Sequence, residues 1–150
     1  SNPYTGVGAI FLSRIKNEKP PIVYEDGLQT RDFISVNDLV EANYMAFNST
    51  SSNFETFNVG SGKPVSIKKV AQTISEKLGS GIQPKITGEF RKGDVRHCFA
   101  DISKITSKIG WKPKTSFENG IKELVDWSKN QNAVDKFDHA LSELKARNLT

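Results

Sequence analysis

The stretch that decides the fold runs from Pro20 to Ala42 and reads PPIVYEDGLQTRDFISVNDLVEA. Its first part, Ile22 to Tyr24, is a short run of β-prone side chains, and the next three residues, Glu25 to Gly27, have the composition of a turn. A second extended run is predicted from Thr30 to Val36. Two short extended runs, joined by a turn and followed at once by a helical pattern, indicate a chain that mixes strands and helices.

Helical spacing of apolar side chains continues outward from this stretch in both directions. Helices are predicted over residues 5–17, 37–47 and 67–78, between Asp101 and Gly110, and from Ser116 onward. Ser35 or Asn37 would cap the second helix, and Ser66 is a good cap for the third. Extended segments are predicted between the helices, at residues 54–59, 82–90 and 97–100. The fold class is therefore α/β, or α+β for the isolated piece.

The patterns also predict which side chains face inward. The inward residues of the helix over 37–47 would be Leu39, Val40, Tyr44 and Phe47, and those of the helix after Ser116 would be Phe117, Ile121, Leu124, Val125 and Trp127. Residues 1–132 are interpreted as the main portion of the chain, and residues 133–150 as an amphipathic C-terminal helix. Its narrow apolar stripe either packs on the chain's own core or binds a partner; the stripe comprises Val134, Phe137, Leu141 and Leu144.

Composition narrows the function classes. The 150 residues are 36% hydrophobic and 25% charged, with a net charge of +4. No apolar run approaches the ~20 residues that a membrane helix requires. The mild basic excess suits an anionic ligand, and the aromatic residues do not interleave with a basic patch as in nucleic-acid binders. The single cysteine, Cys98, makes a reduced, cytoplasmic setting the default, and no Cys/His cluster has metal-ligand spacing.

Two segments carry candidate anion ligands. Arg31 begins an extended run just after a turn, and a guanidinium on a rigid strand suits bidentate phosphate binding, with Asp32 able to orient it. The alternative is a structural Arg–Asp pair. In the second segment, RKGDVRH, Arg91 and Arg96 could form an anion-binding turn, and Asp94 could accept hydrogen bonds from sugar hydroxyls. The alternative there is a solvated charged loop.

No catalytic set is found among the 150 residues. None of the three tyrosines is followed four residues later by the lysine that would lower its pKa. The fragments Gly6-Val7-Gly8 and Gly60-Ser61-Gly62 lack the third glycine of a dinucleotide-binding loop. The sequence therefore predicts ligand binding, with no catalytic, cofactor-binding or metal-ligating residue assigned.

Taken together, five runs resemble a known family. They are PPIVYEDGLQTRDFISVNDLVEA at 20–42, FNVGSGKPVSI at 57–67, RKGDVRHCFADISK at 91–104, IGWKP at 109–113 and SFENGI at 116–121. In this order they are similar to the C-terminal part of the NAD-dependent nucleotide-sugar epimerases and dehydratases, which are extended short-chain dehydrogenases/reductases. The resemblance covers about residues 1–128. The opening SNPYTGV is similar to the branch of dTDP-rhamnose and UDP-glucose 4-epimerases.

The resemblance implies roles for individual residues. Arg31 and Arg91 would bind the diphosphate of a UDP- or dTDP-sugar, and Asp94 would hold ribose hydroxyls. Ile22, Val23 and Tyr24 would lie against the uracil or thymine ring. The family's Rossmann half, with its NAD-binding G-x-x-G-x-x-G and catalytic Y-x-x-x-K, has no counterpart in these residues. The parent enzyme would use NAD to oxidise and reduce the sugar at C4, and this piece alone would be inactive.

The resemblance leaves other readings open and adds one structural expectation. The parent could be a dehydratase, decarboxylase or reductase of the same superfamily, or the piece could be a non-catalytic interaction module. The parent is expected to be a homodimer.

In the family, the segments at 33–47 and 54–59 pack on the NAD domain. Their apolar side chains are therefore expected to be exposed or covered by self-association; these are Val36, Leu39, Val40, Phe57 and Val59.

Overall fold

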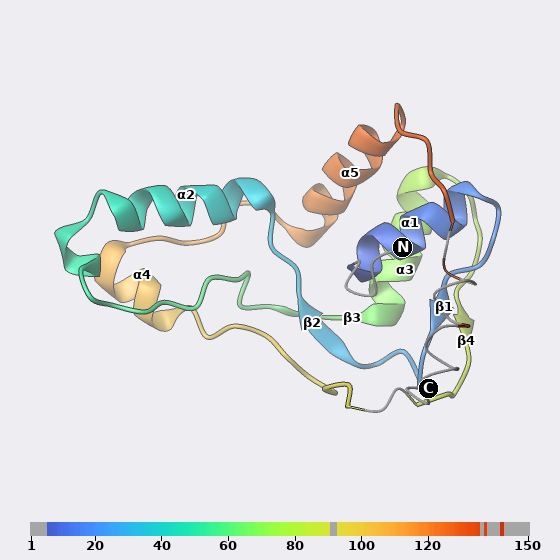
Figure 1. Ribbon diagram of the computed structural model, residues 1–150, viewed down its shortest axis with the longest axis horizontal. Helices are drawn as coiled ribbons and strands as arrows, with labels where there is room; N and C mark the ends of the chain where they lie inside the picture. The colour runs from blue at the N-terminus through green and yellow to red at the C-terminus, as the bar shows by residue number, and fades with distance from the viewer. Residues whose placement is uncertain (1–5, 91–92, 136, 138–141, 143–150) are drawn as a thin grey trace. The chain divides into compact units, whose positions relative to one another are not determined.

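The computed structural model describes residues 6–90, 93–135, 137 and 142, whose path is traced in Figure 1. The chain forms two compact units, each assembled from separate stretches of sequence. Unit 1 comprises residues up to 29, residues 66–96 and residues from 121 onward, and unit 2 comprises residues 30–65 and 97–120. Helices and short strands occur in both units, so the mixed α/β class is confirmed.

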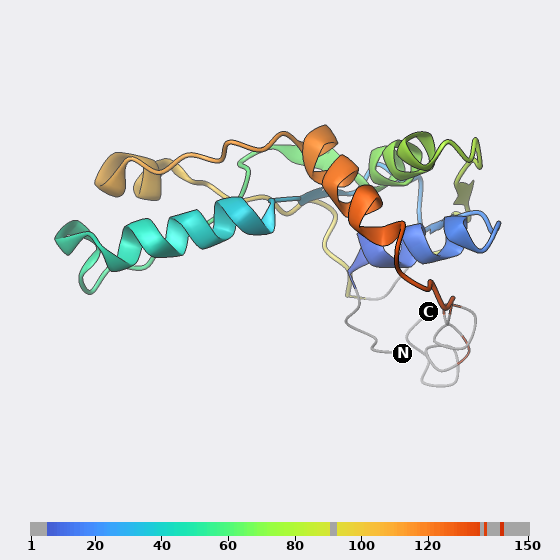
Figure 2. The ribbon, with the colours of Figure 1, turned by 90° about the horizontal axis from the view of Figure 1, so that it is seen from above.

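Unit 1 is built around three helices, visible from a second direction in Figure 2. They are α1 (Val7–Lys16), α3 (Ile67–Leu78) and α5 (Phe117–Ser128), the last of which begins in unit 2. Each helix buries one apolar stripe, as its periodicity predicted. The buried apolar residues of the unit are Phe11, Leu12, Ile15, Val23, Ile67, Val70, Ala71, Ile74, Ile121 and Val125. Trp127 was predicted to face inward, but 63% of it is exposed, because Val125 and Ser128 occupy the buried side of the last turn.

One short parallel sheet accompanies these helices. Strand β1 (Ile22–Val23) pairs with β4 (Lys85–Ile86), with Ile22 opposite Lys85 and Val23 opposite Ile86. Thr87 N continues the pairing by donating to Val23 O at 3.0 Å. The extended segment predicted over 82–90 is therefore confirmed, although only two of its residues form a strand. The segments that leave the ends of β1 and β4 consequently start side by side.

The helix starts follow the predicted caps. At three helices the cap side chain accepts a hydrogen bond from a backbone N–H of the first turn; these caps are Ser35, Ser66 and Ser116. Helix α4 begins one residue later than predicted: its N-cap is Ile102, and Asp101 accepts a hydrogen bond from Ser103 N just ahead of it. Helix α3 also ends where predicted, at Gly79, which adopts a left-handed conformation. Among the described residues, every helix is too short or too polar to reach across a lipid bilayer.

The chain beyond α5 is tied back onto α1 by buried polar contacts. The Nη1 atom of Arg14 lies 3.4 Å from Oδ2 of Asp135, and both side chains are almost fully buried. The Arg14 guanidinium also lies 4.7 Å from the ring centroid of Phe137. Asp135 and Phe137 therefore contact their own unit, whereas Val134 is 69% exposed and residues 133–135 do not form the predicted helix. Leu141 and Leu144 lie outside the described residues, and the boundary at residues 132–133 stays a prediction.

Unit 2 has a smaller apolar cluster. Its elements are β2 (Thr30–Asp32), α2 (Val36–Phe47), the 3-10 turn η1 (Thr50–Ser52), β3 (Pro64–Ser66), which ends at the first residue of the next unit 1 stretch, and α4 (Ser103–Ile109), with β2 hydrogen-bonded to β3. Ala42, Ile105 and Trp111 form the buried centre of the cluster. The half-buried residues around that centre are Ile34, Met45, Phe57, Val59, Ile102 and Ile109.

Three extended segments predicted in unit 2 are shorter than expected or absent. The run from Thr30 to Val36 forms a strand only as far as Asp32, and residues 97–100 contribute a single bridge, between Thr30 and His97. The strand predicted over 54–59 is wrong. Phe54 has a positive φ of 59° and a fully exposed side chain, and the segment pairs with no strand in the described structure. Apolar alternation alone does not make a strand where no ladder partner is available.

Helix α2 turns its larger apolar side chains outward. Val36 is 69% exposed, Val40 61% and Phe47 89%, whereas Ala42 is buried in the cluster. The prediction that Leu39, Val40, Tyr44 and Phe47 face the core is wrong, because the cluster takes the opposite side of the helix. The family-based expectation of exposed side chains is confirmed for Val36, Leu39 and Val40, whereas Phe57 and Val59 are half-buried.

The carboxylate of Asp32 joins three segments of unit 2. Oδ1 accepts hydrogen bonds from Ser61 N at 2.7 Å and Ser61 Oγ at 2.5 Å, while Oδ2 accepts from Gly62 N at 3.0 Å and Ala100 N at 3.1 Å. Burial acts to raise the pKa of Asp32, but the hydrogen bonds from Ser61, Ala100 and Gly62 outweigh it and hold the pKa below its ordinary value. The end of β2 is therefore fixed to both loops.

We predict that Gly60→Ala destabilises unit 2. A Cβ at Gly60 would lie 2.5 Å from Asp32 Oδ2 and 2.6 Å from Ala100 Cβ, closer than atoms can approach. The cost of such overpacking is about 1–3 kcal/mol. Chemical denaturation measures it. The matched control is Gly8→Ala inside α1, where the added Cβ would meet only Leu124 Cδ2 at 3.8 Å, and which should be neutral or stabilising. Equal stability of the two variants would contradict the prediction.

We predict that Asp32→Asn costs about 2 kcal/mol of unfolding free energy at neutral pH, because hydrogen bonds to an ionised carboxylate are replaced by bonds to a neutral amide. The pKa of Asp32 is lower in the folded chain than its unfolded value of about 3.9. The stabilisation is therefore fully present above that value and is lost as the pH falls through the folded pKa. Urea unfolding at pH 7 and pH 3 should show the gap between wild type and variant narrowing in acid. A gap that stays constant would rule out this assignment.

Candidate functional site

The segment predicted to lie against a base forms β1 and its end in unit 1. Val23 is fully buried, whereas Ile22 and Tyr24 are half-buried. The carbonyl oxygen of Tyr24 accepts hydrogen bonds from Gly27 N at 3.2 Å and from Gln29 Nε2 at 3.1 Å. The backbone at the end of the strand is therefore held by the turn after it.

That turn is compact and specifically requires glycine. Gly27 has a φ of +77°, and a Cβ there would lie 3.0 Å from both Lys68 Cβ and Val23 Cγ1. The Gly27 carbonyl accepts from Lys68 N in the first turn of α3 at 3.0 Å, and Asp26 Oδ1 accepts from Leu28 N at 2.9 Å. A side chain at this position would combine an unfavourable φ with close contacts. The turn is thus fixed against both α3 and β1.

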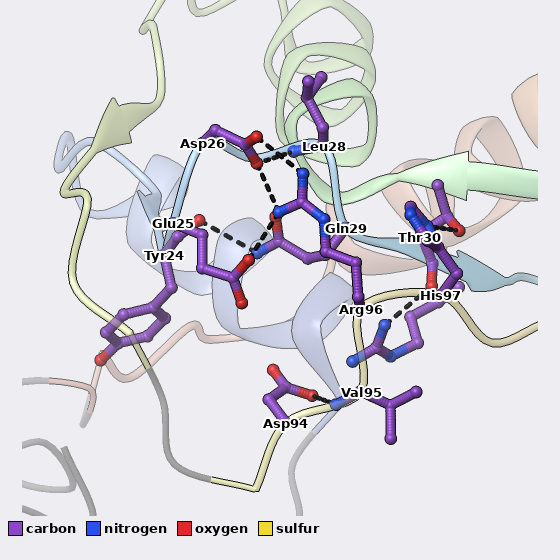
Figure 3. Close-up of polar contacts among 11 residues, drawn as sticks. Tyr24, Glu25, Asp26, Leu28, Gln29, Thr30, Asp94, Val95, Arg96 and His97 are labelled. Carbon is purple, nitrogen blue, oxygen red and sulfur yellow. Dashed lines mark hydrogen bonds and ion pairs between the residues drawn. The ribbon is translucent and has the colours of Figure 1, made fainter.

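Two acidic side chains of the turn bind one arginine, as Figure 3 shows. Arg96 Nη1 lies 2.6 Å from Glu25 Oε2 and 2.8 Å from Asp26 Oδ1, and Nη2 lies 2.7 Å from Asp26 Oδ2. The hydrogen bonds from Arg96, followed by that from Leu28 N, lower the pKa of Asp26 well below its ordinary range. The hydrogen bonds to Asp26 and then Glu25 raise the pKa of Arg96. We call Glu25, Asp26 and Arg96 the Arg96 cluster.

The segment predicted to bind an anion, residues 91–97, has described residues near both of its ends, Glu89 and Arg96, in contact with this same turn. At its start, Glu25 N donates to Glu89 O at 3.0 Å, and Gly88 N donates to Glu25 O at 3.1 Å. At its end is Arg96. Asp94 is exposed and accepts a hydrogen bond from Val95 N at 2.9 Å, while Arg91 lies outside the described residues. Within unit 1, the structure therefore brings the Tyr24 strand and the base of the Asp94 loop together.

Arg31 lies in the other unit, on β2. Its Nη1 donates to Thr30 O at 2.8 Å. The hydroxyl of Thr30 is 2.9 Å from Nδ1 of His97, and Cys98 N donates to Thr30 O at 3.1 Å. His97 thus has a structural role beside β2, and Cys98 is exposed. The convergence of Arg31 with Arg91 on one diphosphate stays a prediction.

The glycines of the chain do not form a site for the pyrophosphate of NAD. The backbone N–H groups of Ser61 and Gly62, which a phosphate would need, already donate to the Asp32 carboxylate. Nor do three His, Cys, Asp or Glu side chains gather as metal ligands in the described portion.

Sequence reasoning missed the role of Arg96. It was interpreted as a second arginine of the anion-binding turn, together with Arg91, whereas its guanidinium is bound to Glu25 and Asp26. These partners are 70 and 71 residues away in sequence. The sequence did contain a hint, because an acidic pair lies in a predicted turn and an arginine lies in a predicted ligand segment. The pairing of β1 with β4, which brings the two segments together, could not be seen in the sequence.

Comparison with known proteins places this geometry in a family. Residues 8–124 match the family model described as GDP-mannose 4,6 dehydratase. The dTDP-L-rhamnose 4-epimerase of Burkholderia thailandensis is 41% identical over 128 residues, which are 85% of this chain and 35% of that protein. The chain thus spans about a third of the length of this relative.

Solved structures of the family have the same fold. The UDP-N-acetylglucosamine 4-epimerase of Methanobrevibacter ruminantium, solved with UDP-N-acetylmuramic acid, matches with a TM-score of 0.79 and 38% identity over 88% of this chain and 42% of its own. The UDP-glucose 4-epimerase of Thermus thermophilus, solved with NAD, matches with a TM-score of 0.73 and 28% identity over 88% of this chain and 43% of its own. The match over residues 8–124 and the shared fold show that this chain belongs to the nucleotide-sugar epimerase and dehydratase family.

Proposed function

We propose that this chain is the part of an NAD-dependent 4-epimerase that holds the nucleotide diphosphate of a UDP- or dTDP-sugar. In this proposal Arg31 and Arg91 bind the two phosphates, and Asp94 accepts hydrogen bonds from the ribose hydroxyls. Ile22, Val23 and Tyr24 lie against the base. The similarity to 4-epimerases over 85–88% of the chain supports the substrate class.

The observation that carries the proposal is the arrangement around the turn after β1. The strand assigned to the base and the loop assigned to the phosphate and ribose leave the same turn, because Glu25 binds the chain on both sides of that loop. A nucleotide requires one site that contacts its base, ribose and phosphates at once. Guanidinium groups suit the phosphates because they bind them through paired hydrogen bonds.

Hydride transfer would take place outside this chain's own residues. The amides of its Gly-x-Gly fragment are bound to Asp32, and no tyrosine is followed four residues later by lysine. In the parent protein, NAD would accept a hydride from the sugar C4 and return it, while this chain orients the sugar nucleotide. A reducing, cytoplasmic setting is part of the proposal and rests on the single cysteine.

A dehydratase is the second candidate for the parent reaction, because the matching family model is described by a dehydratase. Reductase and decarboxylase activities use the same ligand class. The nucleotide site proposed for this chain would be common to all of them. Analysis of the products that the full-length protein forms from UDP- and dTDP-sugars separates these reactions.

We predict that the full-length protein binds UDP or dTDP more tightly than AMP in calorimetry. Arg31→Ala and Arg91→Ala should each weaken that binding by about 1.5–3 kcal/mol, the range for hydrogen bonds to charged groups. Lys104→Ala is the matched control, because this exposed cation binds Glu55 on unit 2 and has no proposed ligand contact. Equal weak binding of all three nucleotides, or unchanged binding in both arginine variants, would reject the proposal.

We also predict that the 150-residue chain self-associates through the outer face of α2, which comprises Val36, Val40, Tyr44 and Phe47. Their exposure leaves an apolar surface that the rest of a homodimeric parent would cover. Burying one such side chain contributes about 2 kcal/mol, so Val40→Ser with Phe47→Ser should weaken association by about a hundredfold to a thousandfold. Sedimentation measures this. Trp127→Ser, on an exposed position of α5, is the control. A wild-type monomer at high concentration would contradict the prediction.

A further inference from the structure

The end of α1 binds the segment that follows α5 through a series of side-chain donors. Lys16 Nζ donates to Ser128 O, at the last residue of α5, at 2.5 Å and to Gln131 O at 2.8 Å. Asn17 Nδ2 donates to Ala133 O at 2.9 Å. A cation at the C-terminus of a helix pairs with its free carbonyls and with the negative end of its dipole. Lys16 therefore caps α5 and holds the backbone just beyond it.

One side chain of the segment, that of Asp135, is bound as well. Its Oδ2 lies 3.4 Å from Arg14 Nη1 and 3.0 Å from Lys19 Nζ. The two cations reach the same carboxylate because the chain reverses at the end of α1, where Glu18 has a positive φ of 58° and Lys19 N donates to Arg14 O at 2.9 Å. The Asp135 side chain is 5% exposed, so these cations replace the water that burial removes from the carboxylate.

The burial pattern of the segment is that of an extended peptide with one side against the unit. Ala133 is half-buried and the Asp135 side chain is almost fully buried, whereas Asn132 and Val134 are exposed. Successive side chains of an extended chain point in opposite directions, which gives this period of two. The contacted residues, Gln131, Ala133 and Asp135, have the same spacing.

We propose that the end of α1, Arg14 to Lys19, is a recognition site for an extended acidic segment, and that residues 129–135 occupy it as a strap that opens without unfolding the rest of unit 1. Every residue of the strap is described, and none belongs to the buried apolar core. Opening would return its donors and acceptors to water, which restores most of their hydrogen bonds. Segments with few buried apolar contacts open locally in this way. The inference is independent of the proposed nucleotide site.

The contacts also define which side chain the site selects. Only a carboxylate at position 135 can accept charge-assisted hydrogen bonds from Arg14 and Lys19 at once. A neutral amide there would leave two neighbouring cations without the negative charge that lies between them. At position 134 the side chain is 69% exposed, so a change there should leave the strap in place.

The test uses the full-length protein with Asp135→Asn and, as the matched control on the opposite side of the strap, Val134→Ser. Hydrogen exchange of the amides of residues 129–135 should accelerate about tenfold to a hundredfold in Asp135→Asn, the scale of lost hydrogen bonds to a charged group. Lys19→Gln, which keeps the Arg14 contact, should accelerate exchange less, and Val134→Ser should leave it unchanged. Helix α3, in the core of the same unit, should keep its wild-type exchange in every variant.

A synthetic peptide with the sequence of residues 129–135, KNQNAVD, provides the second readout. Added to the full-length Asp135→Asn protein, whose own strap is weakened, it should shift the NMR signal of the Asn17 side-chain amide. The same peptide carrying Asp135→Asn should bind about tenfold more weakly or less tightly still.

Three results would overturn the inference. Wild-type exchange of the strap in Asp135→Asn would mean that the carboxylate does not hold it. Equal acceleration in the strap and in α3 would mean that the segment opens only when the whole unit unfolds. Equal binding of the two peptides, or no binding of either, would mean that the end of α1 is not a recognition site for an acidic segment.

Discussion

Carboxylates that accept several hydrogen bonds each hold the segments that are proposed to bind the ligand, in unit 2 and in unit 1 alike. In unit 2 the Asp32 carboxylate accepts four hydrogen bonds from two loops, and it does so one residue after Arg31. In unit 1 the Asp26 carboxylate, with Glu25, binds Arg96 next to the Asp94 loop. An ionised carboxylate has several acceptor sites and loses free energy if they stay empty, so it fixes every donor around it.

These polar contacts matter because the sheets are too small to order the chain by themselves. Strands β1 and β4 contribute two residues each, and β2 and β3 three each. A two-stranded sheet of that length is marginal in water. Side-chain hydrogen bonds therefore fix the positions of the loops, which a wider sheet would otherwise do. The same arrangement leaves little room for a side chain at two glycines. An added Cβ at Gly60 would meet Asp32, and an added Cβ at Gly27 would meet Lys68.

The helices could be predicted from sequence and the strands largely could not, for a physical reason. A helix is a local structure, so the caps at Ser35, Ser66 and Ser116 were sufficient to locate three of them. A strand needs a partner that is distant in sequence, and the segment over 54–59 has none in the described structure. The same limit applies to the candidate site: Ile22–Tyr24 and Asp94 were assigned to the ligand by resemblance, an assignment that stays a prediction, whereas the contacts of Arg96 required knowledge of which carboxylates it meets. The inward face of α2 was mispredicted because its apolar residues outnumber the positions that the Ala42 cluster can cover.

The two units alternate along the chain, which passes between them after residues 29, 65, 96 and 120. Two of these passages lie beside residues assigned to the ligand, between Gln29 and Arg31 and just after Arg96. No single cut in the polypeptide can therefore release either unit intact. Recombination between related genes exchanges one continuous block of sequence. Such an exchange would join part of each unit to residues from another protein. The two units should consequently be inherited together, and this part of the protein should diverge by point substitution rather than by exchange of modules.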